Sequence, residues 1–181
     1  MNTYLKSIGL VVISFLSFTS CKEQEQKVEN IVEVEEVATV DISAEKEAVA
    51  TVMKNYQNAI ENLTTEGTKS LFAKESSVFE SGGVEGTYEN YEAHHLGPEL
   101  KAFDSFKFSD YKIDIEVDLP YAFVTETYIY TIGLKANKDK GREARTVEQK
   151  GVATSYLKKI DGEWKIIKTH TSARKLSKAS H

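Results

Sequence analysis

The chain has 181 residues, of which 40% are hydrophobic and 28% charged, and its formal net charge at pH 7 is −5. This length and composition predict one ordinary folded domain with an additional segment attached. The single Cys excludes an internal disulfide and a CxxC metal site, and the acidic balance argues against a nucleic-acid partner bound through phosphate neutralisation.

Residues 1–21 have the pattern of an export signal. The cationic Lys6 precedes the apolar run 8–16, which is shorter than the roughly 20 residues that span a bilayer. The tripeptide Thr19-Ser20-Cys21 resembles a bacterial lipobox, which implies cleavage before Cys21 and its acylation, palmitate included. Two or more acyl chains would anchor the protein stably in the cell envelope, and we expect the outer membrane. The alternative is a plain secretory peptide with an incidental Cys.

Residues 22–43 are expected to form an acidic, disordered tether. From 22 to 47 the chain has nine acidic residues against three Lys, whereas residues 48–181 carry equal numbers of acidic and basic groups. Dense like charge with few aromatic residues disfavours folding. Cys21-Lys22-Glu23 also resembles signals that send some Bacteroidetes lipoproteins to the cell surface. A simple solvated linker on a periplasmic protein is the alternative.

Helical patterns dominate the first half of the folded region. Apolar residues recur at helical spacing from Glu45 to Leu63, with Ser43 as the expected N-cap. A second short helix is expected at 66–73, followed by a strand at 76–81 that ends in a turn at Gly82-Gly83. A third helix, 87–96, should break at Gly97-Pro98, because the residue before Pro avoids helical geometry.

Beyond Pro98 the spacing of apolar residues changes from helical to every second residue, which is typical of strands. This spacing predicts four long strands at 106–117, 121–134, 147–160 and 163–172. The alternation changes phase near Ser109-Asp110, which predicts a β-bulge. Asp161-Gly162 predicts a two-residue hairpin turn. Regular pairing from that turn would place Leu157 opposite Ile166, Ser155 opposite Lys168 and Ala153 opposite His170.

These elements predict an α+β domain over residues 44–175, with three N-terminal helices packed on a curved, mostly antiparallel sheet and a basic tail at 176–181. The closing run from Asp161 to Ser172 and the segment 94–100 resemble bacterial members of the nuclear transport factor 2-like (SnoaL-like) superfamily. The resemblance covers roughly residues 45–175. It implies an internal pocket between helices and concave sheet, and homodimerisation through the sheet. Its members include isomerases, cyclases, dehydratases and binding modules, so it assigns no activity.

Candidate site residues follow from side chains that this fold would direct into the pocket. His95 and His170 are candidates for an acid–base pair. The candidate pocket lining consists of Tyr56, Tyr91, His94, Tyr128 and Trp164. The alternatives are that His170 only hydrogen-bonds a helix and that the aromatic residues belong to the core or to a dimer face. We expect no metal and no cofactor, because HExxH, Walker and Rossmann patterns do not occur in the sequence.

The leading hypothesis is a lipid-anchored envelope protein whose pocket binds a small apolar or aromatic molecule or a partner, with catalysis not established. The alternative is an isomerase- or cyclase-type enzyme that uses the pocket histidines for proton transfer. A third hypothesis is an interaction module that dimerises through its open sheet face.

Overall fold

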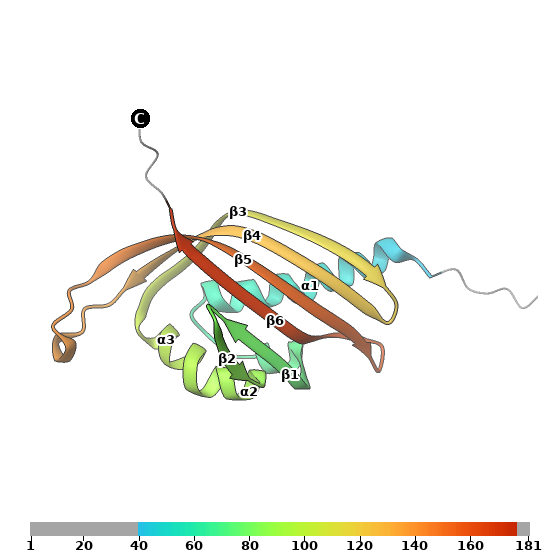
Figure 1. Cartoon of the computed structure of the whole chain (residues 1–181), viewed down its shortest axis with the longest axis horizontal. Coiled ribbons are helices and arrows are strands. Elements are labelled where there is room, and N and C mark those ends of the chain that lie inside the picture. Colours follow the sequence, from blue (N-terminus) through green and yellow to red (C-terminus); the bar gives the residue numbers. More distant parts are fainter. Residues whose placement is uncertain (1–39, 177–181) are drawn as a thin grey trace, which may run out of the picture. The chain divides into compact units, whose positions relative to one another are not determined.

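A computed structural model of the chain describes residues 40–176. The predicted signal peptide with Cys21, the predicted tether up to residue 39 and the tail beyond residue 176 lie outside the described residues. Within residues 40–176, helices lie along the concave side of a curved six-stranded sheet (Figure 1). The predicted α+β class is confirmed.

The sheet has the strand order β2-β1-β6-β5-β4-β3. Its strands are β1 (Phe72–Glu80), β2 (Gly83–Gly86), β3 (Phe103–Asp118), β4 (Tyr121–Leu134), β5 (Arg145–Ile160) and β6 (Glu163–Lys175). The four long predicted strands are therefore confirmed, three of them longer than expected. The sheet is mixed, because β1 runs parallel to β6 while the other neighbours are antiparallel.

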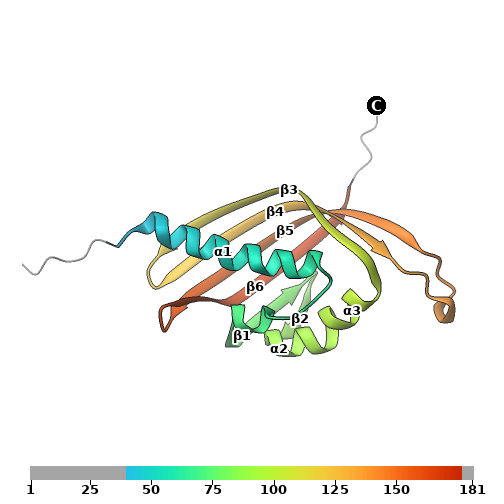
Figure 2. The same cartoon turned by 180° about the vertical axis from the view of Figure 1, so that it is seen from behind.

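Helix α1 (Ile42–Glu61) runs across the concave face of the sheet (Figure 2). Its buried side includes Val49, Met53 and Ile60, as the apolar spacing predicts. The N-cap is Asp41 and not Ser43, because the Asp41 carboxylate accepts bonds from the backbone N–H groups of Ser43 (2.9 Å) and Ala44 (3.1 Å). The helix thus begins two residues before the expected domain boundary.

The prediction of a second helix at 66–73 is wrong. The segment forms only a 3₁₀ turn, Thr68–Leu71, and then enters β1 at Phe72. Phe72 is buried and stacks on Tyr88 with ring centroids 3.7 Å apart. This packing stabilises an extended backbone where local propensity favours a helix. The domain therefore has two helical arms instead of three.

The second arm is one continuous helix through the expected break at Gly97-Pro98. It consists of α2 (Tyr88–Tyr91), a π-helical turn (Glu92–Leu96) and α3 (Gly97–Lys101). The wider π turn accommodates a proline that has no N–H to donate. A Cβ on Gly97 would lie 2.7 Å from the Glu92 carbonyl oxygen, so the residue before Pro98 must be Gly for the arm to continue.

Two bulges decide which side chains face the concave side. In β3 the register shifts between Ser109 and Lys112, and Asp110 has φ = 48°, which confirms the predicted bulge. In β6 an extra residue, Ile167, follows the predicted Leu157–Ile166 pair. From there on the expected pairings are wrong by one residue.

After the β6 bulge, Ser155 pairs with Thr169 in place of Lys168, and Ala153 pairs with Thr171 in place of His170. His170 pairs with Thr154, and both are exposed. A one-residue slip moves every following side chain to the opposite face of a strand. His170 therefore lies on the convex face of the sheet.

Candidate active site

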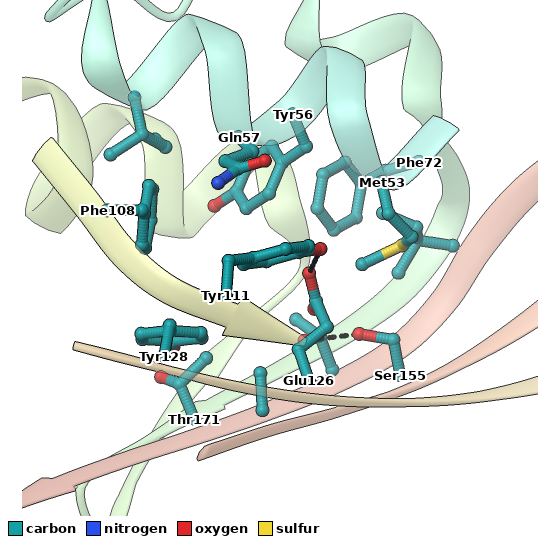
Figure 3. Close-up of a pocket in the computed structure, with 14 residues that line it drawn as sticks. Met53, Tyr56, Gln57, Phe72, Phe108, Tyr111, Glu126, Tyr128, Ser155 and Thr171 are labelled. Carbon is teal, nitrogen blue, oxygen red and sulfur yellow. Dashed lines mark hydrogen bonds between the residues drawn. The ribbon is translucent and has the colours of Figure 1, made fainter. Parts of the chain in front are cut away.

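A two-lobed cavity lies between α1 and the concave face of the sheet. Figure 3 shows the residues that line the inner lobe. The inner lobe has a volume of about 50 Å³ and the outer lobe about 270 Å³. The lobes share the lining residues Tyr56, Ile60, Phe108, Tyr128 and Thr171. An apolar cavity of about 150 Å³ is enough for benzene. The outer lobe therefore has room for a molecule larger than a single ring.

Glu126 is the most deeply placed ionisable group of the inner lobe. It follows Ala122 and Val124 on the inward side of β4 and is only 7% exposed. The Tyr111 hydroxyl donates a hydrogen bond of 2.5 Å to Oε1 of Glu126. Burial raises the pKa of Glu126 above its ordinary value, although the Tyr111 bond acts to lower it. Among residues 40–176, Oε2 of Glu126 has no hydrogen-bond partner and remains for a ligand.

Aromatic rings form most of the wall around Glu126. Phe108 and Tyr128 pack edge to face with centroids 5.0 Å apart, and Tyr111 stacks parallel to Tyr128 at 6.4 Å. The Tyr128 ring lies over Gly151, where an added Cβ would come within 2.2 Å of the ring. Burial raises the pKa values of Tyr56 and Tyr128, so both hydroxyls stay protonated and can donate hydrogen bonds to a ligand.

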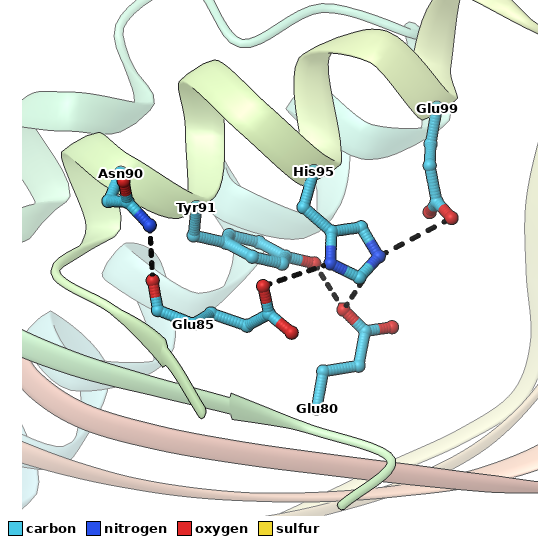
Figure 4. Close-up of polar contacts among 6 residues, drawn as sticks. All are labelled: Glu80, Glu85, Asn90, Tyr91, His95 and Glu99. Carbon is cyan, nitrogen blue, oxygen red and sulfur yellow. Dashed lines mark hydrogen bonds and ion pairs between the residues drawn. The ribbon is translucent and has the colours of Figure 1, made fainter. Parts of the chain in front are cut away.

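A polar cluster lies beside the outer lobe, where the π turn presents His95 to three carboxylates (Figure 4). His95 Nδ1 is 3.1 Å from Glu85, and its Nε2 is 3.4 Å from Glu99 and 3.8 Å from Glu80. Tyr91 donates to Glu80 at 2.7 Å. Burial lowers the pKa of His95, but the three carboxylates outweigh it and raise that pKa above its ordinary value. Both ring nitrogens of His95 therefore face carboxylates, which favours its protonated form.

The family model described as "SnoaL-like domain" matches residues 49–174. The chain belongs to the SnoaL-like domain family. No curated protein matches the sequence. This family match agrees with the resemblance carried by the sequence motifs, and it covers both the cavity and the polar cluster.

Solved structures show the same fold for this SnoaL-like domain. A nuclear transport factor 2-like protein from Salmonella enterica serovar Typhimurium is 20% identical, with a TM-score of 0.64 over 78% of this chain and 99% of that one. A candidate scytalone dehydratase from Novosphingobium aromaticivorans is 17% identical, with a TM-score of 0.60 over 77% and 95%. A candidate ketosteroid isomerase from Shewanella frigidimarina is 22% identical, with a TM-score of 0.51 over 69% and 94%.

The SnoaL-like domain brings together only part of the predicted site. Tyr56, Tyr91 and Tyr128 line the cavity. His95 contacts the cavity-lining Glu80 and Glu99 without lining a lobe itself. Its predicted partner, His170, is on the convex face, so the two histidines do not converge.

Two other predicted residues lie outside the cavity of the SnoaL-like domain. His94 is exposed and lines a surface groove shared with Lys101 and Arg142. Trp164 is buried but lines neither lobe, and its indole N–H donates a 2.8 Å bond to Glu45 near the start of α1. Trp164 therefore ties β6 to α1 and has no contact with the cavity space.

Sequence reasoning missed Glu126 and Tyr111, although a signal for Glu126 was present. In β4 the inward positions are apolar at Ala122 and Val124, and the next inward position is an acid. A carboxylate in phase with core positions is costly to bury and points to a functional site.

Neither a metal site nor a membrane-crossing helix is found in the described part of the SnoaL-like protein. Within residues 40–176, no group of three or more His, Cys, Asp or Glu side chains is arranged to hold a metal ion. Within the same range, no helix combines the length and the apolar character needed to cross a membrane.

Proposed function

We propose that the SnoaL-like domain binds a small, planar, largely apolar molecule in the two-lobed cavity. The observation that carries the proposal is the ring-lined space around a buried, hydrogen-bonded carboxylate. Cavities with apolar walls and a few convergent polar groups are the usual form of small-molecule sites. The ring body would lie in the outer lobe, and its tip would reach the hydroxyls and Glu126 in the inner lobe.

A matched pair of tyrosine variants tests this binding. Tyr128 lines the cavity, whereas Tyr156 is exposed on the convex face at 43%. A thermal-shift screen of aromatic and alicyclic compounds should yield binders whose stabilisation is lost in Tyr128→Leu and retained in Tyr156→Leu. Equal loss in both variants would contradict a site in the cavity.

A second function, acid–base catalysis of the isomerase type, is favoured by the state of Glu126. A carboxylate with a raised pKa is a stronger base than an ordinary one. In this proposal Glu126 Oε2 takes a proton from the ligand carbon beside a carbonyl and returns it to the same conjugated system. Glu126 thus replaces the predicted pair of His95 and His170 as the proton carrier.

Hydrogen exchange of a bound ketone tests the proton transfer without knowledge of the natural substrate. The α-protons of a cyclic ketone that binds in the screen should exchange with D₂O faster in the presence of the protein than in its absence. The exchange is measured by NMR. Glu126→Gln should reduce the exchange rate about 10²- to 10⁴-fold. His170→Asn, the matched change on the convex face, should leave the rate unchanged, and a loss there would contradict the assignment.

The location of the protein remains a proposal that rests on Cys21. We propose that the chain is anchored in the outer membrane through acylated Cys21 and that the acidic segment after it spaces the domain from the lipid. Mass spectrometry of the mature N-terminus should show Cys21 as the first residue with acyl chains attached. An unmodified Cys21 would overturn the anchor.

We also propose that two copies pair through the convex face of the sheet. The exposed side chains on this face form a row of Glu116 in β3, Phe123 in β4, Tyr156 in β5 and Lys168 in β6. The row therefore has an acid at one end, aromatic rings in the middle and a base at the other end. A twofold axis parallel to the strands would place each acid against the base of the other copy and ring against ring.

Charge reversal tests this pairing. Sedimentation should show a weaker dimer for Glu116→Lys and for Lys168→Glu, because each variant places like charges together. The double variant restores opposite charges and should recover the dimer. A double variant as weak as the singles would contradict the proposed axis, and a monomeric wild type would contradict the pairing itself.

A further inference from the structure

The cavity wall carries negative charge and no positive charge. Glu126 faces the inner lobe, and Glu80 and Glu99 face the outer lobe. Among residues 40–176, no Lys, Arg or His lines either lobe. Little water screens the buried charge of Glu126, whereas the side chains of Glu80 and Glu99 are 28% and 50% exposed. The interior therefore disfavours an anionic ligand.

Glu80 and Glu99 approach the same point from different elements. Their carboxylates lie 3.8 Å and 3.4 Å from one atom, Nε2 of His95 (Figure 4). Each carboxylate makes its contacts within the cluster through one oxygen: Glu80 Oε2 accepts a hydrogen bond from Tyr91, and Glu99 Oε1 contacts His95. In the described part of the chain the other oxygens, Glu80 Oε1 and Glu99 Oε2, have no hydrogen-bond partner.

The cluster does not neutralise itself. Glu80, Glu85 and Glu99 surround a single histidine, His95, so the carboxylates outnumber the one group that can carry positive charge, although burial raises the pKa of Glu99. Its field extends into the cavity. After burial, which is the largest cause, the charge of Glu80 contributes to the raised pKa values of four lining tyrosines, Tyr56, Tyr91, Tyr128 and Tyr130.

Aromatic rings line the same outer lobe as Glu80 and Glu99. Phe106 and Tyr130 stack in the outer lobe with centroids 5.5 Å apart, and Tyr91 lies on the helical side. Ring faces attract ammonium groups, and this attraction grows when water is excluded. Carboxylates and ring faces together favour a cation, whereas neither favours an anion.

We infer that the ligand is an amine with an apolar ring body and that Glu80 and Glu99 hold its ammonium group in the outer lobe. This inference rests on the proposed ligand binding and specifies the ligand class. The ammonium group donates to the free oxygens of the two carboxylates. The ring body then extends over Phe108 and Tyr128 towards Glu126.

Three probes of nearly equal shape test the charge preference. They are 1-naphthylmethylamine, 1-naphthalenemethanol and 1-naphthoic acid, each titrated calorimetrically into the full chain at pH 7. The amine should bind about tenfold or more tightly than the alcohol, and the acid should bind most weakly. An alcohol or acid that binds as tightly as the amine would overturn the charge inference and leave the proposed cavity binding intact. If none of the three binds, the proposed function fails and the inference fails with it.

Variants that replace a single carboxylate with an amide test which residues bind the ammonium group. Glu80→Gln and Glu99→Gln should each weaken the affinity for the amine several-fold and change the affinity for the alcohol by no more than about twofold. The reason is that glutamine keeps the shape of the side chain and removes its charge. Glu85→Gln is the matched control, since Glu85 belongs to the same cluster without lining a lobe. A larger loss in Glu85→Gln than in the other two would contradict the assigned position. Unchanged circular dichroism shows that each variant is folded.

Discussion

The two faces of strand β4 differ in chemistry although they alternate along one backbone. On the concave side, Val124 and Glu126 are 2% and 7% exposed and face the helices. On the convex side, Phe123 is 42% exposed and packs edge to face on Tyr156. Water is excluded on one face and present on the other. The same residue type therefore has a different environment on each face: a carboxylate is buried with a raised pKa inside and solvated outside.

The largest expected difference between the faces comes from Gly151→Ala. A Cβ there would meet the Tyr128 ring at 2.2 Å, so the ring must move into the cavity. Overpacking of this kind costs about 1–3 kcal/mol in the free energy of unfolding. Urea denaturation should show this loss, whereas Thr154→Ala on the exposed side of β5 should change stability by no more than about 0.5 kcal/mol. Equal effects would contradict the close contact.

Two neighbouring residues give the next largest contrast. Val124→Thr places a hydroxyl in the buried layer and should cost about 1–3 kcal/mol of unfolding free energy. Phe123→Thr, one residue away on the convex face, should cost about 0.5 kcal/mol when measured at a concentration low enough for the monomer. Similar costs would show that the convex face is covered in the monomer.

Glu126→Gln should make the protein more stable at neutral and higher pH. The folded-state pKa of Glu126 is raised, so its contribution to stability is fully present below the ordinary Glu pKa and is lost as pH rises through the raised value. Gln stays neutral and can still accept the Tyr111 bond. The gain should be about 1–2 kcal/mol at pH 8 and close to zero near pH 4, by urea denaturation. Glu116→Gln on the convex face should show no such trend.

The smallest effect is expected at His95. Its folded-state pKa is raised, so the stabilisation from its carboxylate contacts is present below the ordinary His pKa and is lost as pH rises through the raised value. Partly exposed ion pairs contribute about 0.2–1 kcal/mol. Denaturation between pH 5.5 and 8.5 should show this loss in the wild type and not in His95→Gln. His170→Gln should retain the wild-type profile.

Sequence patterns were informative where side chains of contrasting polarity mark the phase of a strand. The β3 bulge could be predicted because Phe106 and Phe108 alternate on even positions and Ile113 on odd ones. The β6 bulge could not, because the residues after Ile167 are the polar series Lys168, Thr169, His170 and Thr171. A slip among polar residues leaves no trace in hydrophobic alternation.

The helical errors have a different cause, because local rules were overruled by neighbours distant in sequence or by an unusual turn. Phe72 enters a strand because it stacks on Tyr88, sixteen residues later in the chain. Pro98 continues a helix because a π turn precedes it. The site was predicted in part, since tyrosines at strand and helix spacing were recognised. Glu126 was overlooked, because its significance depends on which face of β4 it occupies.

The extra residue in β6 also sets the electrical sign of the cavity. If Ile167 paired regularly with Tyr156, alternation would turn Lys168 and His170 towards α1 and Thr169 and Thr171 towards solvent. The observed bulge does the reverse, so Lys168 and His170 lie outside and two hydroxyls lie inside. One unpaired residue thus keeps the interior free of counterions for its carboxylates.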